Sequence, residues 1–180
     1  MLQNRKLHFT SKSIAVISLV IITVFFLQSP LSAQMKQGNT KDSSKGITIH
    51  QEISFKATPQ QLYEILLSSK KFSDCTKNSF DGFSAKSANI DSVVGGAFSV
   101  FDGHIIGRIL ELVPNQRIVE AWRVVDWPAG DYSIAKFEFK PQGSGTKLIF
   151  DHIGFPEGLK EHLSIGWQQH YWDALIKYLH

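Results

Sequence analysis

The segment from Gly95 to Pro156 is an almost continuous series of short, strand-like stretches, each followed by a turn signal. Asp102-Gly103 is among the strongest short hairpin signals, and the PQGSG sequence at 141–145 is typical of a turn. Within the stretches, apolar and polar side chains alternate, as in the series Ala135, Phe137 and Phe139. Strands joined in succession by tight turns form an antiparallel meander. The fold is therefore expected to be built on an antiparallel sheet.

One strand and two short helices are predicted ahead of this meander. In GITIHQEISFK, residues 46–56, apolar and polar residues alternate, which indicates a strand with one buried face. Thr58 is followed by Pro59 and Gln61, the N-cap, first-turn proline and capping-box pattern of a helix start. This helix, and a second one around Phe72, are expected to be short.

The C-terminal segment is predicted to form one long amphipathic helix. Its apolar residues follow helical spacing and define one face: Leu163, Trp167, Tyr171, Ala174 and Tyr178. Polar residues define the opposite face: Lys160, Gln169, Asp173 and Lys177. This helix is the only predicted element long enough to cover the concave face of a curved sheet. The sequence therefore predicts an α+β domain with its helices on one side of the sheet.

The N-terminal 33 residues have the pattern of a secretory signal peptide. Basic residues precede an uncharged, mostly apolar stretch from Ile14 to Leu27, which is shorter than the about 20 residues of a membrane-spanning helix. Cleavage is predicted after Ala33; an uncleaved membrane anchor is the alternative. Both interpretations place the protein outside the cytoplasm. Residues 34–45 are polar and predicted to be a flexible tether, which leaves 46–180 as the folded domain.

The charge balance gives no indication of nucleic-acid binding. Residues 1–33 contain three of the 19 Lys and Arg residues and none of the 16 Asp and Glu residues. The remainder therefore carries equal numbers of basic and acidic residues, and the sequence pI of 8.9 comes from the leader. A nucleic-acid-binding domain needs a concentrated basic face, and the sequence contains none.

No sequence pattern for catalysis, a cofactor or a metal is present. The histidines are scattered without a ligand motif, and there is no GxSxG nucleophile signature. The GSGTK sequence at 143–147 joins two predicted strands, whereas a phosphate-binding loop joins a strand to a helix. Cys75 is the single cysteine and is expected to be buried and inert rather than reactive. The sequence therefore predicts a non-enzymatic protein with no cofactor and no catalytic residues.

Three residues have two interpretations each. Trp122 is expected to anchor its strand against either the core or a cavity. Trp127, in a Trp-Pro-x-Gly bend, either plugs one end of the hydrophobic interior or presents a surface to a protein partner. His152 shares an inward strand face with Leu148 and Phe150, so it is either a hydrogen-bonded core histidine or a polar contact inside an apolar pocket. The inward face of the strand with Arg108 and Glu111 is undetermined, although these two side chains are expected to be solvated.

Several motifs carry a resemblance to a known family. They are GGAFSVFDGHIIGRILELVPNQRIVEAWRVVDWPAGDYS at 95–133, Gly145-Thr146, GFP at 154–156 and GWQQHYWDALIKYL near the C-terminus. The chain resembles the SRPBCC or START-like superfamily and, within it, the C-terminal domain of the activator of heat shock protein 90 ATPase family. The resemblance implies a helix-grip fold over residues 46–180, in which a curved antiparallel sheet wraps around a long C-terminal helix. It implies no catalytic residues.

Two functions are expected. In the first, a small apolar ligand or lipid binds between the sheet and the terminal helix. The predicted lining residues are Phe98, Phe101, Trp122, Phe137, Phe139, His152, Trp167 and Tyr171. In the second, the domain contacts a protein partner, as a chaperone activator does, with Trp127 as the candidate contact. A cavity-based enzyme ranks last, because His152 is the one candidate polar group. The oligomeric state is not predicted.

Overall fold

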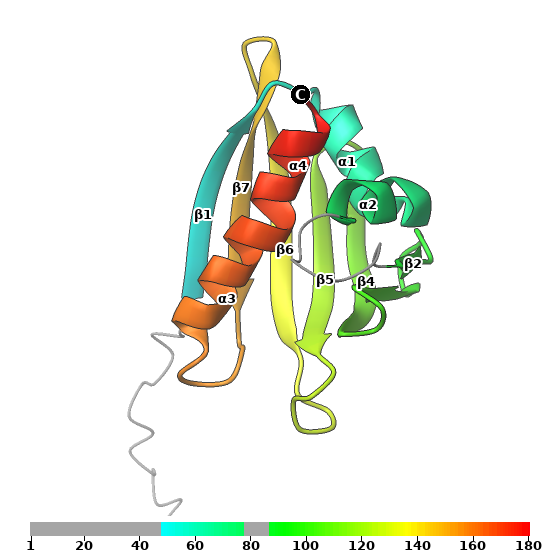
Figure 1. The fold of residues 1–180 in the computed structure, drawn as a ribbon, viewed down its shortest axis with the longest axis vertical. Coiled ribbons are helices and arrows are strands. Elements are labelled where there is room, and N and C mark those ends of the chain that lie inside the picture. Colours follow the sequence, from blue (N-terminus) through cyan, green and yellow to red (C-terminus); the bar gives the residue numbers. More distant parts are fainter. Residues whose placement is uncertain (1–47, 78–86) are drawn as a thin grey trace, which may run out of the picture. The chain divides into compact units, whose positions relative to one another are not determined.

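The computed structural model describes residues 48–77 and 87–180. The predicted signal peptide and tether, residues 1–33 and 34–45, lie outside the described residues. The first elements are β1 (Thr48–Phe55), α1 (Pro59–Leu67) and α2 (Ser69–Thr76). Six strands follow: β2 (Asn89–Ile90), β3 (Ala97–Val100), β4 (Ile105–Val113), β5 (Arg117–Val124), β6 (Ser133–Gln142) and β7 (Gly145–Ile153). The chain then forms the C-terminal helix, as predicted (Figure 1).

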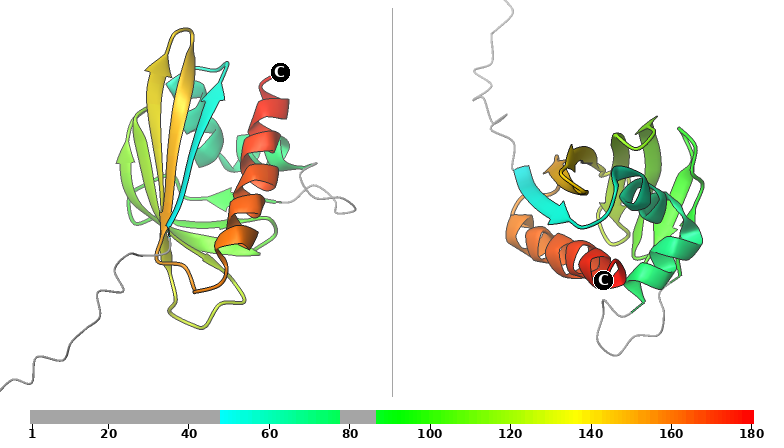
Figure 2. Two further views of the ribbon diagram at one scale, coloured as in Figure 1. Left: turned by 90° about the vertical axis from the view of Figure 1, so that its left-hand side faces the viewer. Right: turned by 90° about the horizontal axis from the view of Figure 1, so that it is seen from above.

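The described strands form one curved antiparallel sheet with the order β1-β7-β6-β5-β4-β3-β2. Strands β2 to β7 pair with their neighbours in the chain, which confirms the predicted meander. The first strand, β1, joins the far edge by pairing with β7, so that Ile49 lies opposite His152. The helices all lie on the concave side of the sheet (Figure 2). This is the predicted α+β helix-grip architecture.

Helix α1 begins where the sequence indicates. The Thr58 hydroxyl accepts a hydrogen bond from the backbone N–H of Gln61 at 3.2 Å, and the Gln61 side chain accepts one from the backbone N–H of Thr58 at 2.9 Å. This reciprocal capping box satisfies two backbone donors that the helix itself leaves free. The apolar face of α1, with Leu62 and Ile65, is buried in the core.

Strand β4 contains a bulge, which explains why its inward face could not be assigned from the sequence. The pairing with β5 shifts between Ile109 and Glu111, so Leu110 is an inserted residue and is 46% exposed. Before the bulge the odd-numbered positions face the core, and after it the even-numbered ones do. Arg108 and Glu111 both point to the outer face, as expected, and Glu111 makes a bidentate ion pair with Arg117.

The C-terminal helix consists of α3 (Lys160–Trp167), a π-helical turn (Gln168–Trp172) and α4 (Asp173–Tyr178). Trp167 and Tyr171 are buried, as predicted. The prediction for Tyr178 is wrong, because this side chain is 43% exposed, whereas Trp172 and Leu175 are buried. The wider π turn rotates the last part of the helix, so that a different set of side chains faces the sheet after Tyr171.

Candidate functional site

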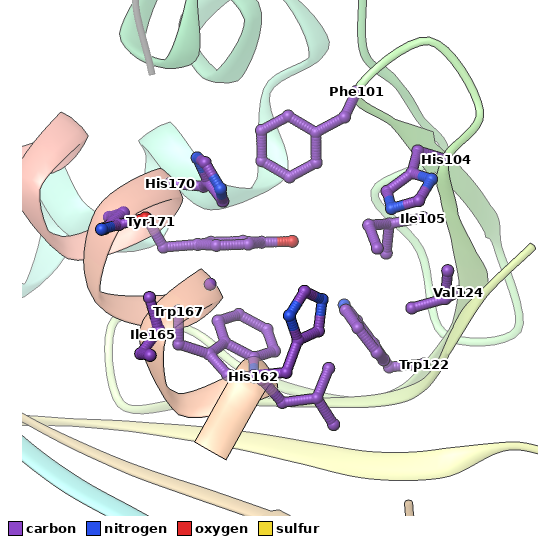
Figure 3. Close-up of a pocket in the computed structure, with 13 residues that line it drawn as sticks. Phe101, His104, Ile105, Trp122, Val124, His162, Ile165, Trp167, His170 and Tyr171 are labelled. Carbon is purple, nitrogen blue, oxygen red and sulfur yellow. The ribbon is translucent and has the colours of Figure 1, made fainter. Parts of the chain in front are cut away.

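A pocket of about 340 Å³ lies between the C-terminal helix and the nearby ends of the central strands (Figure 3). Phe101 and Ile105 come from the β3–β4 turn and the start of β4, and Val124 comes from the end of β5. The helix contributes Trp167 and Tyr171. The described lining also includes three histidines: His104, His162 and His170. The interior is thus mainly aromatic and aliphatic.

Four of the eight predicted ligand-binding residues line this pocket: Phe101, Trp122, Trp167 and Tyr171. Phe98 and Phe137 instead line a small cavity of about 10 Å³, which they share with Tyr171. A space of this size is at the lower limit for one water molecule. Phe139 and His152 are buried and line neither space among the described residues.

His152 belongs to a hydrogen-bonded chain that joins the helix to three strands. The Trp167 indole N–H donates to His152 Nδ1 at 3.0 Å, and His152 Nε2 lies 2.7 Å from Ser133 Oγ. The Ser133 hydroxyl donates to the Trp122 carbonyl at 2.8 Å. Since Nδ1 is the acceptor, the ring proton is on Nε2. Burial lowers the pKa of His152 to about 3, so the ring is neutral. Both ring nitrogens therefore have protein partners. Of the two interpretations of His152, this arrangement fits the hydrogen-bonded core histidine.

Trp122 and Tyr171 direct polar atoms into the pocket. The Trp122 side chain is buried, with 3% exposure, and its indole N–H has no hydrogen-bond acceptor among residues 48–77 and 87–180. The indole nitrogen points toward the Tyr171 hydroxyl (Figure 3). Burial raises the pKa of Tyr171, nearby Glu120 raises it further, and the Trp122 N–H lowers it in part. Tyr171 therefore stays protonated at neutral pH.

Glu120 is the polar residue of this interior that sequence reasoning missed. It lies on β5 opposite Ile109 and lines the small cavity next to Tyr171. Burial raises the pKa of the Glu120 carboxyl to about 8. No ion pair or hydrogen bond to this carboxyl is formed by the described part of the chain. The available signal was its position between Ile118 and Trp122, at an inward-facing place in an alternating strand.

The Trp-Pro-x-Gly bend is held by Arg123. Its guanidinium donates to the carbonyls of Val125, at 3.1 Å, and Trp127, and lies 5.5 Å from the ring centre of Tyr132. Trp127 packs edge-on against Trp122, with ring centres 5.5 Å apart, and is only partly buried. Trp127 thus covers the outer side of Trp122 and still presents a surface to solvent.

The described residues provide neither a reactive thiol nor a metal site. Cys75 is buried, and burial raises its thiol pKa to about 12, so the thiol is not ionised at neutral pH. Within 48–77 and 87–180, His, Cys, Asp and Glu side chains form no group of three suited to a metal ion. No helix in these same ranges combines the length and hydrophobicity of a membrane span.

Comparison with known proteins is consistent with this architecture. The sequence model of the family described as "Activator of Hsp90 ATPase homolog 1-like protein" matches residues 56–180. The mouse activator of 90 kDa heat shock protein ATPase homolog 2 is 30% identical over 129 residues, 72% of this chain and 37% of the relative. The human homolog 1 is 26% identical over 82% of this chain and 40% of its own length. The chain thus spans about two fifths of these relatives.

Solved structures show the same fold. The crystal structure of an HSP90 activator from Plasmodium falciparum is 27% identical, has a TM-score of 0.65 and is matched over 72% of this chain and 94% of that chain. A protein from Chromobacterium violaceum is 26% identical with a TM-score of 0.59, matched over 73% of this chain and 96% of that chain. From the matched family model and the shared fold together, the chain belongs to the family of activator of Hsp90 ATPase homolog 1-like proteins, within the START-like superfamily.

Proposed function

We propose that this domain binds a small apolar molecule in the pocket between β4, β5 and the C-terminal helix. The observation that supports this most directly is the pocket itself. Its volume of about 340 Å³ falls within the range typical of small-molecule sites, and aromatic rings form much of its lining. Polar side chains form the smaller part of its described lining, with three histidines, Gln169 and Tyr171, and groups of this kind orient a ligand by hydrogen bonds.

Gly166 provides a second argument for ligand binding. It lies within α3 and lines the pocket, and a Cβ added there would have no atom within 4 Å. A glycine inside a helix is less stable than an alanine by about 0.5–1 kcal/mol. The structure has room for the alanine, so close packing does not explain the glycine. Its effect is to leave the pocket open on the helix side.

The test is to fill the pocket at this position. We expect the neutral fluorescent probe N-phenyl-1-naphthylamine to bind the wild-type protein, and Gly166→Leu to weaken its binding at least about tenfold, because the side chain occupies the ligand volume. Glu161→Leu, an exposed position outside the pocket lining on the same helix, is the matched control and should bind as the wild type does. Native mass spectrometry of protein purified from its own host should reveal a bound small molecule. Absence of probe binding, together with an empty native spectrum, contradicts the proposal.

Because a signal peptide is predicted, we also propose where the ligand is bound. With residues 1–33 acting as a leader, the domain would meet its ligand outside the cytoplasm. N-terminal sequencing of the protein from its host tests this: a mature start at Gln34 supports export with cleavage after Ala33. An intact N-terminus on soluble cytoplasmic protein contradicts it.

A chaperone partner is the second candidate function, because the similar proteins are named as activators of a heat shock protein ATPase. The β5–β6 loop offers a surface for it, with Val125 and Tyr132 exposed and Trp127 partly so. The test is the ATPase rate of an Hsp90-class chaperone from the same organism with and without the protein. Stimulation that is lost in Trp127→Ala/Tyr132→Ala but kept in Gly166→Leu supports a surface contact independent of the pocket; no stimulation by the wild type contradicts it.

A further inference from the structure

We infer that the molecule bound in the pocket is electrically neutral and presents a hydrogen-bond-accepting oxygen to the indole N–H of Trp122 and the hydroxyl of Tyr171. This inference rests on the proposed ligand-binding function and specifies the chemical class of ligand. An aromatic or alicyclic ketone, ester or quinone has this chemistry.

The Trp122 indole is the main evidence. The other two fully buried indoles each have an acceptor: Trp167 donates to His152 at 3.0 Å, and Trp172 donates to Gln51 at 2.7 Å. Trp122 is comparably buried and makes no hydrogen bond of ordinary geometry within the described ranges 48–77 and 87–180, although its N–H faces the Tyr171 hydroxyl closely enough to lower the pKa of that group. Buried donors without acceptors are rare, because the lost hydrogen bond to water is not replaced. The N–H points toward the Tyr171 hydroxyl at the pocket wall, so an occupant that reaches between these two groups is in position to accept from it (Figure 3).

Tyr171 adds a second donor at the same place. Its ring lines both the pocket and the small cavity that contains Glu120, and its hydroxyl lies near the Trp122 nitrogen. A phenol can donate or accept, whereas an indole N–H can only donate. One oxygen atom of a ligand, with two lone pairs, is therefore able to accept from both groups.

The charge of the pocket indicates a neutral ligand. None of its described lining residues is Lys, Arg, Asp or Glu. A buried ionic group would lack an ion-pair partner there, and burial of an unpaired charge is costly.

Three probes with the same naphthalene ring test whether the pocket prefers a neutral oxygen acceptor, a hydrocarbon or an anion. They are 2-acetonaphthone, which has a carbonyl oxygen, 2-ethylnaphthalene, which lacks it, and 2-naphthoate, which is anionic. Their affinities are measured at pH 7.5 by displacement of N-phenyl-1-naphthylamine. We expect the ketone to bind about tenfold more tightly than the hydrocarbon, the scale of a hydrogen bond to a buried, otherwise unpaired donor, and the anion to bind most weakly.

Two variants identify the donors. Trp122→Phe and Tyr171→Phe should each reduce the preference for the ketone over the hydrocarbon, while the hydrocarbon still binds. Tyr178→Phe, on the same helix as Tyr171 and outside the pocket lining, is the matched control and should keep the preference. Nuclear magnetic resonance of the wild-type protein gives a readout that does not depend on the variants folding. The Trp122 indole N–H resonance should move downfield with the ketone and not with the hydrocarbon.

The outcomes distinguish the inference from the function on which it rests. If none of the three probes binds, the proposed function fails. If ketone and hydrocarbon bind equally, or the naphthoate binds best, or the Trp122 N–H resonance responds to both neutral probes alike, the pocket binds ligands but the inference is overturned.

Discussion

At the scale of single residues, Glu120 is the least expected feature of the interior. Its carboxyl lies beside apolar side chains and Tyr171, with a pKa raised by burial to about 8. The alternating pattern around it would have placed it on the inward face, but a charged residue in a strand is ordinarily assigned to the solvent side. The cavity that it lines is formed by residues from helices α1 and α2, strands β2, β3 and β6, and the C-terminal helix, which the fold brings together.

Glu120→Gln should alter how stability depends on pH. The folded-state pKa of about 8 is above the ordinary value of 4.5, so between these values the folded protein holds a proton that the unfolded chain has lost. Wild-type stability contributed by this group is therefore present below pH 4.5 and is lost as the pH rises to 8. The glutamine variant lacks this loss and should gain on the order of 2–4 kcal/mol relative to the wild type between pH 4.5 and 8.5, less than the full conversion of the shift because the side chain is only partly buried. Urea unfolding at both pH values measures it; a difference that does not change with pH contradicts the assignment.

His152→Leu should destabilise the protein by about 2–4 kcal/mol. The substitution removes the acceptor of the Trp167 indole N–H and the partner of Ser133, and leaves buried polar groups without hydrogen bonds. Chemical denaturation monitored by tryptophan fluorescence measures the loss. The exposed His162→Leu is the control, with an expected change within about 0.5 kcal/mol. Equal midpoints for the two variants would show that the chain through His152 does not stabilise the fold.

At the scale of elements, the sequence predicts those whose signals are local. The capping box at Thr58, the alternation in β6 and the hairpin turns were all interpreted correctly. The inward face of β4 was left undetermined, and Tyr178 in the last part of the C-terminal helix was wrongly predicted to face the sheet, for the same reason. Each contains one inserted residue, at Leu110 and in the turn Gln168–Trp172, and a strict period of 2 or 3.6 cannot anticipate where a strand bulges or a helix widens.

The candidate site was predicted in part for a related reason. Phe101, Trp122, Trp167 and Tyr171 were identified because large aromatic residues on inward faces are expected to line an interior. Whether an inward aromatic residue borders a cavity or fills the core depends on how the helix packs on the sheet. These four residues border the pocket, whereas Phe139 and His152 are buried in the core. Gly166 was missed because a missing side chain produces no apolar signal.

Deletion of Gln169 tests the π-helical turn. Gln169 is exposed, so its side chain contributes little to packing, but removing the residue returns the turn to ordinary helical spacing. Trp172 and Leu175 should then rotate away from the core, at a cost of at least about 3 kcal/mol, the scale of losing one large buried side chain. Thermal and urea unfolding provide the measurement, with Gln169→Ala as a control that should remain near wild type. A deletion variant as stable as that control contradicts a structural requirement for the turn.

At the scale of the whole molecule, the two faces of the sheet differ in chemistry. The concave face carries the core, whereas the outer face carries ion pairs across neighbouring strands. Examples are Lys136 with Asp151 at 2.9 Å and Lys147 with Glu52 at 2.7 Å. Exposed pairs of this kind add little stability but keep the outer face polar. Exposed apolar side chains occur at the β5–β6 loop and also elsewhere, with Val93 and Val94, between β2 and β3, more exposed than those of the loop.

The topology also predicts slow folding. Strand β1 pairs with β7, and the hydrogen bond between His50 and Asp151 joins residues 101 positions apart in sequence. Such non-local pairing requires a large loop to close before the contacts form, and folds dominated by it refold in milliseconds to seconds. Stopped-flow tryptophan fluorescence after dilution from urea should show this, with any slower phase accelerated by a prolyl isomerase. Complete refolding within microseconds contradicts this prediction.

At Gly166, on the pocket side of α3, the shape of the cavity can be changed separately from the stability of the fold. In most interiors, a change that reshapes a binding cavity also disturbs the packing that keeps the chain folded. At Gly166 an added Cβ has no atom within 4 Å, so an alanine there takes volume from the cavity without displacing a neighbour. A single substitution there can therefore reduce the space for a ligand while the scaffold stays intact, which gives evolution, or an engineer, control over selectivity at one position.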